Sequence, residues 1–253
     1  MFPYLYQSTA LTIGTYGVML ALAYLVGRHI YIAELNRIDK NINVEIFILS
    51  LLIVGVIGAK LMFLFKNPDK GSLTQLSSLT SATGFSSQGA ILGAIIVTVI
   101  FSKINQIKLN LLLDSAAPAA IVAYAIARVG CFLSGDDCHG IESDLPWAMT
   151  FPNGLSKTEV PVHPVPLYEV IYSIFIWLYL LHSKKKPLRP YQLFFTFIFL
   201  WGVCRFLVEF VAANPIKIIG MSGSQFGALL MFISGSIYFF RLYLNQATKK
   251  KPG

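Results

Sequence analysis

Long apolar runs alternate along the chain with shorter stretches that hold most of the charged residues. A helix needs roughly 20 mainly apolar residues to cross a bilayer, and seven runs approach that length. They predict transmembrane helices at about 10–29, 45–65, 88–102, 110–133, 167–182, 190–213 and 222–244. We therefore expect an all-α polytopic membrane protein, formed by a single integral membrane domain over residues 1–253 with a polar loop at 134–166.

The composition supports this assignment. Hydrophobic residues make up 55% of the 253 residues and charged residues only 13%, whereas a soluble domain carries about 25% charged residues. The charges are also segregated between the apolar runs. A soluble globular protein is therefore excluded.

The basic residues between the predicted helices are distributed unevenly. Of the 20 lysines and arginines, 13 lie in the loops after the first, third, fifth and seventh helices, and 4 lie on the opposite side. Because cytoplasmic loops are enriched in Lys and Arg, we expect a periplasmic N-terminus and a cytoplasmic C-terminus. The formal net charge of +8 then describes a surface that faces anionic membrane lipids, and no nucleic-acid partner is expected.

Several ionisable residues lie inside predicted membrane helices, where each costs about 2.5–3.5 kcal/mol unless it is paired or functional. They are Lys60, Asp114, Arg128, Arg205 and Glu209. Arg205 and Glu209 are four residues apart on one helical face and are expected to form an ion pair. The cations still exceed the acids, and guanidinium groups bind phosphate bidentately. We interpret Arg128 and Arg205 as a phospholipid headgroup site; the alternative is that these charges only hold helices together.

The segment AIARVGCFLSGDDCHG carries Arg128 to the end of a predicted helix. The helix is expected to break at Gly130 and to open there toward the headgroup. Cys131 and Cys138 could form a disulfide, or they could form a zinc site together with His139. Their spacing matches no established zinc motif and a fourth ligand is missing, so we expect neither a metal nor a cofactor.

Three other polar positions have ordinary structural explanations. Tyr16 is typical of an aromatic residue at the membrane interface. Gln88 precedes Gly89 and Gly93, whose Gly-x-x-x-Gly spacing suits close helix packing. Glu169 follows a proline-rich stretch and is expected in the first turn of a helix, where a carboxylate interacts favourably with the helix dipole.

The order of seven segments along the chain resembles that of the prolipoprotein diacylglyceryl transferase family. The segments are YGVML, IGAK, SSQGAILGAI, ARVGCFLSGDDCHG, DLPWAMTFPNG, VHPVPLYE and CRFLVEF, and they cover about residues 11–235. The resemblance implies a seven-helix enzyme of the bacterial inner membrane. Such an enzyme transfers the diacylglyceryl group of phosphatidylglycerol to the lipobox cysteine thiol of a prolipoprotein signal peptide and releases glycerol phosphate.

Motif by motif, the resemblance carries the family's functional positions onto this chain. The matching residues are Tyr16, Arg128, Asp136 or Asp137, Gly140, His163, Tyr168, Glu169, Arg205 and Glu209. We expect headgroup binding from Arg128, Arg205, Lys60, Gly140 and Glu169. We expect catalytic roles for Arg128, Arg205, Gln88, Asp136, His139, Glu209 and Tyr16.

The chain also departs from the family's pattern. The family signature Gly-Arg-x-Gly-Asn-Phe-x-Asn-Gly-Glu has two asparagines that are Cys131 and Ser134 here, and Lys60 stands where an arginine is usual. The acidic loop is one residue longer, which leaves open the register between Asp136 and Gly140.

The most consequential departure concerns the proton acceptor. The family's His-Gly-Gly motif, whose histidine is proposed as the catalytic base, begins here with Gln88. A free thiol with a pKa of about 8.5 is only slightly ionised at neutral pH, and a positioned base contributes about 10²–10⁴ in rate. His139, Asp136 or Asp137 could replace it, or the field of the arginines could lower the thiol pKa.

Two alternative functions stay open, the first because of this departure and the second because of the buried charges. One is a divergent family member that binds phospholipid headgroups or modifies a different acceptor. The other is a small-solute transporter that uses the buried charges, which the lack of repeat symmetry disfavours.

Overall fold

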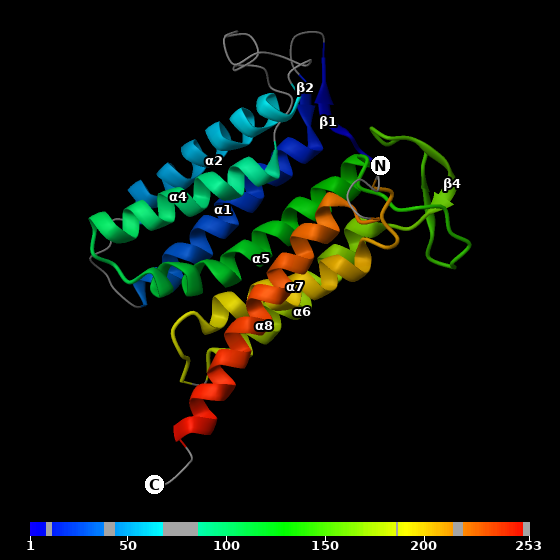
Figure 1. Cartoon of the computed structure of the whole chain (residues 1–253). Helices are drawn as coiled ribbons and strands as arrows, with labels where there is room; N and C mark the ends of the chain where they lie inside the picture. Colours follow the sequence, from blue (N-terminus) through cyan, green and yellow to red (C-terminus); the bar gives the residue numbers. More distant parts are fainter. Residues whose placement is uncertain (9–11, 38–43, 68–85, 186, 215–219, 250–253) are drawn as a thin grey trace. The chain divides into compact units, whose positions relative to one another are not determined.

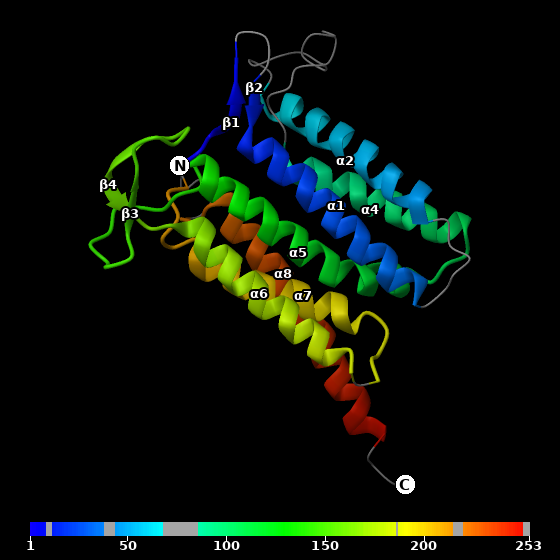
Figure 2. The same cartoon turned by 180° about the vertical axis from the view of Figure 1, so that it is seen from behind.

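The computed structural model describes residues 1–8, 12–37, 44–67, 86–185, 187–214 and 220–249. Within these ranges it contains seven helices: α1 (Thr15–Asn36), α2 (Val44–Lys66), α4 (Ser87–Ile104), α5 (Leu109–Ser134), α6 (Val165–Ser183), α7 (Gln192–Val208) and α8 (Gly223–Lys249). Four short strands form two antiparallel pairs: β1 (Tyr4–Gln7) with β2 (Thr12–Gly14), and β3 (Met149–Phe151) with β4 (Thr158–Val162). Figures 1 and 2 show these elements from opposite sides.

The described helices are those of a multi-pass membrane protein. Five of them, α1, α2, α5, α6 and α8, are long and apolar enough to cross a membrane, while α4 and α7 are shorter apolar helices. Large apolar side chains are exposed along them, as Phe175 at 67% and Phe240 at 62% illustrate. Lipid, rather than water, is the solvent that tolerates such side chains.

Three of the predicted helix ranges need correction. The first helix runs to Asn36 and not to residue 29, and the seventh runs to Lys249 and not to residue 244. The first helix starts at Thr15 and not at residue 10, because the aromatic N-terminal stretch forms the β1–β2 hairpin. The sixth ends at Val208 and begins at Gln192, within the predicted range 190–213. Apolar residues precede Thr15 and follow Val208. Hydropathy therefore could not reveal where the helical hydrogen bonding begins in α1 or stops in α7.

The chain divides into two compact units. The first comprises Met1–Tyr31 and Asp114–Gly253, and so contains both hairpins, α6, α7, α8 and most of α1 and α5. The second comprises Ile32–Leu113 and contains α2 and α4.

The core of the first unit lies where α5, α6 and α7 run side by side (Figure 1). Its buried members are Ala117 and Ile121 of α5, Tyr172, Ile176 and Leu180 of α6, and Leu193 of α7. At the N-terminal end of α7, the carboxylate of Asp114 accepts hydrogen bonds from the backbone N–H groups of Tyr191 (2.8 Å) and Phe194 (2.9 Å). Asp114 therefore satisfies donors that the first turn of a helix leaves unpaired.

The second unit is a close pair of helices. A Cβ atom added to Gly89 of α4 would lie 2.0 Å from the carbonyl oxygen of Gly58 in α2, and one added to Gly93 would lie 2.7 Å from that of Val54. Only glycine lets two backbones approach this closely. The predicted role of Gly89 and Gly93 in helix packing is confirmed.

The predicted break at Gly130 is wrong. Helix α5 continues through Gly130 to Ser134, and the chain reverses at Gly135, whose φ is +60°. Gly130 serves packing instead, since an added Cβ would lie 2.8 Å from the Cβ of Met19 in α1. The left-handed conformation at Gly135 is the usual way to end a helix.

The polar loop predicted at 134–166 lies between α5 and α6 and carries the β3–β4 hairpin, a feature that hydropathy did not predict (Figure 2). The loop is anchored to neighbouring backbone at Gly140, whose N–H donates to the carbonyl of His163 (2.8 Å). An added Cβ at Gly140 would lie 2.2 Å from the carbonyl oxygen of Val211. A glycine is thus required where three chain segments meet.

Candidate active site

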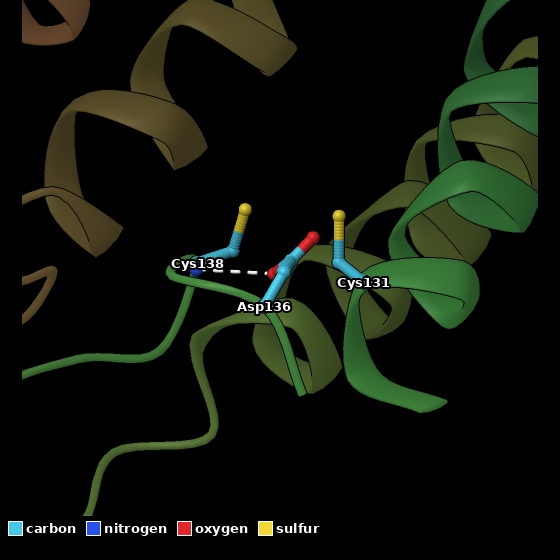
Figure 3. A group of neighbouring side chains, drawn as sticks. All are labelled: Cys131, Asp136 and Cys138. Carbon is cyan, nitrogen blue, oxygen red and sulfur yellow. Dashed lines mark hydrogen bonds between the residues drawn. The ribbon is translucent and has the colours of Figure 1, made fainter. Parts of the chain in front are cut away.

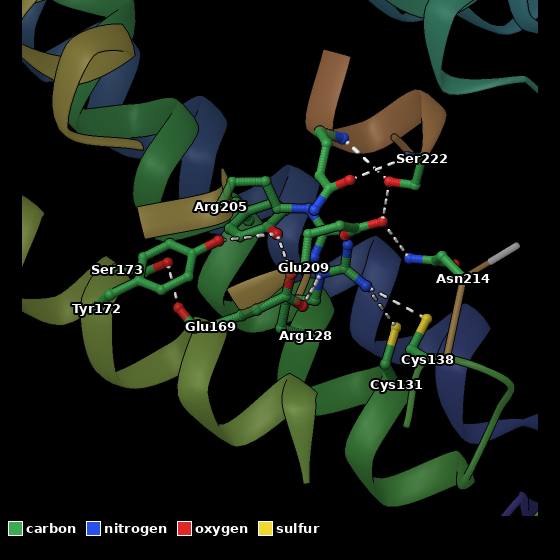
Figure 4. A network of polar contacts seen from close by, with 12 residues as sticks. Arg128, Cys131, Cys138, Glu169, Tyr172, Ser173, Arg205, Glu209, Asn214 and Ser222 are labelled. Carbon is green, nitrogen blue, oxygen red and sulfur yellow. Dashed lines mark hydrogen bonds and ion pairs between the residues drawn. The ribbon is translucent and has the colours of Figure 1, made fainter. Parts of the chain in front are cut away.

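A network of polar residues in the first unit gathers around one buried carboxylate, that of Glu169 in α6 (Figure 4). Its side chain is fully buried, and Nε of Arg128 lies 2.7 Å from its Oε2 atom. Arg205 of α7 forms an ion pair with Oε1, which also accepts a hydrogen bond of 2.8 Å from the hydroxyl of Tyr124. One carboxylate therefore holds two guanidinium groups from two different helices.

Arg205 continues this network toward the end of α7. Its Nη2 atom lies 2.7 Å from Oε2 of Glu209, which confirms the predicted ion pair. Oε1 of Glu209 accepts hydrogen bonds from Ser222 (2.5 Å) and from Asn214 (2.7 Å). Arg205 is thus fixed between two carboxylates by both ends of its guanidinium group.

This geometry corrects the predicted excess of positive charge around the arginines. Glu169 was expected in the first turn of its helix, but it lies in the second turn of α6, facing Arg128 and Arg205. With Glu209, the cluster holds two guanidinium groups and two carboxylates. Its formal charge is balanced, which reduces the cost of burying each ion.

The second contact of Arg128 is with sulfur. Its Nη1 atom lies 3.3 Å from Sγ of Cys138 and 3.7 Å from Sγ of Cys131, and its guanidinium carbon lies 5.0 Å from the ring centroid of Tyr124. Both cysteines are free thiols. The structure therefore has no disulfide between Cys131 and Cys138. Among the described residues, the side chains that it brings together as potential metal ligands are Cys131, Asp136 and Cys138, without His139.

A cavity of about 200 Å³ opens beside this cluster. A cavity needs about 10–15 Å³ to hold one water molecule, so this one has room for a small polar group. Its walls come from α5, α6, α7, the start of α8 and the loops after α5 and α7: Arg128, Asp137, Cys138, His139, Val165, Glu169, Arg205, Ala212, Asn214 and Ser224.

The two neighbouring acids of the loop after α5, Asp136 and Asp137, have different surroundings. Asp137 lines the cavity, whereas Asp136 accepts a hydrogen bond from the backbone N–H of Cys138 (3.1 Å) and so shapes the turn.

Other expected site residues lie around this cavity or support it. Tyr16 of α1 contacts α5 at Gly130, since its ring lies 3.4 Å from the position of an added Cβ there. His163 shares a 3.1 Å hydrogen bond with the hydroxyl of Tyr168, which also accepts one from Trp147 (2.8 Å). These contacts fix the start of α6 against the loop.

Two expected site residues belong to the second unit. Lys60 of α2 is 5% exposed. Gln88 lies in the first turn of α4, is exposed, and accepts a hydrogen bond from Lys66 of α2. Both residues lie in the α2–α4 pair, and their participation in the site around Arg128 and Arg205 stays a prediction.

Sequence reasoning missed several members of the network, among them Tyr124, Tyr172, Asn214 and Ser222. A signal for Tyr124 was present, because it precedes Arg128 by four residues and so shares its helical face. Tyr172 likewise follows Glu169 by three residues, and its hydroxyl lies 3.2 Å from that of Tyr124. Asn214 and Ser222 lie in irregular chain after α7, where no periodicity applies.

A family sequence model described as prolipoprotein diacylglyceryl transferase matches residues 3–241. The chain belongs to this family. The match extends from α1 into α8 and includes the arginine–glutamate cluster and the loop that lines the cavity.

Individual relatives agree with this membership. The chain is 29% identical to a phosphatidylglycerol–prolipoprotein diacylglyceryl transferase of Clostridium tetani, over 94% of this chain and 97% of the relative. It is 29% identical to the enzyme of the same name in Dehalococcoides mccartyi strain BAV1, over 98% and 96%. For the enzyme of that name in Listeria welshimeri the identity is 27%, over 96% and 91%.

Proposed function

We propose that this protein transfers the diacylglyceryl group of phosphatidylglycerol to the lipobox cysteine thiol of a prolipoprotein and releases glycerol phosphate. The observation that carries the proposal is the pair of arginines, held by one carboxylate, at the wall of a cavity in a chain of the transferase family. The reaction forms a sulfur–carbon bond at the glycerol and breaks the bond from that carbon to a phosphate oxygen.

Charge develops on the departing phosphate oxygen during this displacement. Fixed hydrogen-bond donors lower the barrier most when they need no reorganisation. Glu169 and Glu209 supply that rigidity to Arg205, and Glu169 supplies it to Arg128. Both guanidinium groups are therefore proposed to contact the phosphate, and the two glutamates to position them.

The site is proposed to act at the outer face of the bacterial cytoplasmic membrane, with the N-terminus outside and the C-terminus inside. The uneven distribution of Lys and Arg supports this orientation. The loop after α5 lines the cavity, and a secreted prolipoprotein presents its cysteine on that side. Reporter fusions at residues 103–109 and 183–189 should report the cytoplasm, and fusions within 134–166 the outside.

A second candidate function is binding of phospholipid headgroups, or modification of a different acceptor. Gln88 favours it, because an amide cannot accept the thiol proton at the position where the family has histidine.

The deciding experiment incubates purified full-length protein with phosphatidylglycerol and a peptide containing a lipobox cysteine. Mass spectrometry should detect the thioether product, and a peptide with serine in place of the cysteine should stay unmodified. Arg128→Ala and Arg205→Ala should lose most turnover, while Arg37→Ala, on an exposed side chain, should keep it. Lipid binding without thioether at any pH would favour the second candidate.

A further inference from the structure

Three side chains beside Arg128 present their metal-binding atoms to one point in space (Figure 3). Sγ of Cys131, Sγ of Cys138 and a carboxylate oxygen of Asp136 all lie within 4.8 Å of one another. Ligands of tetrahedral zinc, with Zn–S distances of about 2.3 Å, lie roughly 3.5–4 Å apart. The three atoms therefore need only a small contraction to become three corners of a zinc site.

Local chain geometry accounts for this convergence. Cys131 lies in the last turn of α5, and the left-handed Gly135 turns the chain back over it. One carboxylate oxygen of Asp136 accepts the N–H of Cys138. Figure 3 shows the other oxygen on the same side as the two sulfur atoms. The turn thus orients all three ligands before any metal arrives.

The surrounding charges also suit a metal. Two thiolates and one carboxylate around Zn²⁺ leave a net charge of −1, which the guanidinium of Arg128 offsets. Its Nη1 atom already lies within hydrogen-bonding distance of both sulfurs. Donors to the ligand atoms are the usual outer partners of metal sites and tune their affinity.

The cluster touches the cavity of the candidate active site, since Cys138 is one of its lining residues. Three protein ligands leave one tetrahedral position open, as in catalytic zinc sites. A thiol that reaches the open position loses its proton to the metal's charge. That is the step for which Gln88 offers no base.

We propose that Cys131, Asp136 and Cys138 bind one Zn²⁺ ion, and that its fourth position takes the acceptor thiol. The assignment of the fourth ligand rests on the proposed transferase function, whereas the metal site does not.

The chemistry balances without a redox partner. The acceptor thiol binds the metal as thiolate and releases its proton to water. The sulfur electron pair forms the bond to the glycerol carbon, and the electron pair of the broken carbon–oxygen bond leaves with the phosphate. The resulting thioether is a weak ligand for zinc and dissociates.

Metal binding is tested directly on full-length protein in detergent, reduced and stripped of metal, by titration with Co²⁺. We expect one Co²⁺ per chain with sulfur-to-cobalt charge-transfer absorption, and displacement by Zn²⁺. Cys138→Ser and Asp136→Asn should weaken binding by at least about 100-fold, more than loss of an outer partner costs. The matched controls Cys204→Ser and Asp137→Asn should bind as the unaltered protein does.

Measurements on the unaltered protein test the metal site even if a variant misfolds. No charge-transfer band after reduction, or a Cys131–Cys138 disulfide that persists under reductant, would overturn the metal site. Equal binding by Cys138→Ser and by Cys204→Ser would do the same.

The open position is tested by adding the lipobox peptide to the cobalt-loaded protein. Its thiol should intensify the charge-transfer band, and the serine peptide should leave it unchanged; an unchanged band with both peptides refutes the fourth-ligand assignment. Thioether formation by metal-free protein would leave the proposed function intact and overturn the metal's role. Cobalt and thiol binding without thioether would do the reverse.

Discussion

Oε2 of Glu169 lies 2.7 Å from Nε of Arg128, and the carboxylate that makes this contact is fully buried. Its other oxygen pairs with Arg205, so two cations from different helices depend on one anion. Removing one partner from a buried ion pair costs about 3–5 kcal/mol, because the remaining charge is left uncompensated. Glu169 is therefore the residue on which the site's integrity depends most.

Glu169→Gln should lower the melting temperature and abolish most transfer activity, because Arg128 would lose its carboxylate partner and Arg205 would keep only Glu209. Thermal unfolding in detergent and the thioether assay measure the two effects. Glu159→Gln is the matched control, since Glu159 is exposed on β4. Equal melting temperatures for the two variants would contradict the central role of Glu169.

Arg205→Lys should be nearly as damaging to catalysis as Arg205→Ala. The guanidinium pairs with Glu169 through Nη1 and with Glu209 through Nη2, and an ammonium group lacks this planar fork. We expect kcat/KM to fall by about 10²–10³-fold, the usual cost of losing a fixed transition-state donor. Arg37→Lys, on a 75% exposed side chain, should retain full activity; a similar loss in both would point to a general effect of substitution.

Gly89→Ala should destabilise the α2–α4 pair. The new methyl group would lie 2.0 Å from the carbonyl oxygen of Gly58, and overpacking costs about 1–3 kcal/mol. Gly55→Ala in α2 meets no atom within 4 Å and should be neutral or slightly stabilising, because alanine favours the helix. Melting temperatures of both variants test this, and the reverse order would refute the packing argument.

Periodicity and hydropathy were sufficient to predict features that depend on residues close together in the sequence. The Arg205–Glu209 pair follows from a spacing of four residues, and the Gly89–Gly93 face from small residues one turn apart. The ion pairs of Glu169 could not be predicted from sequence, because its partners Arg128 and Arg205 lie on other helices, distant from it in the chain. The end of α5 was misjudged because a glycine such as Gly130 can serve packing as well as breakage.

Charge counting had the same limitation. It treated Arg128 and Arg205 as excess cations because Glu169 was assigned to a helix dipole. Cys131 and Cys138 were judged by zinc-motif spacing, which describes ligands on regular hairpins, whereas here the turn at Gly135 brings the sulfurs together. Tertiary contacts, not motif spacing, decide which polar residues meet.

Gln88 stands where the family has its proposed base. Its side chain accepts a hydrogen bond from Lys66, so Gln88→Ala should cost only about 0.5–1.5 kcal/mol of stability. If a metal ionises the acceptor thiol, both Gln88→Ala and Gln88→His should keep kcat/KM near that of the unaltered protein, with the same pH profile. Cys138→Ser should instead lose most activity, and Cys204→Ser should not.

The opposite result is equally specific. A positioned imidazole, which ordinarily titrates near about pH 6.5, would add a base where none exists. A rise in kcat/KM for Gln88→His between pH 7 and 8, toward the roughly 10²–10⁴ that a general base contributes, would show that thiol deprotonation limits the unaltered enzyme. Such a rise would contradict an acceptor thiol already ionised by zinc, since a group that has lost its proton gains nothing from a base.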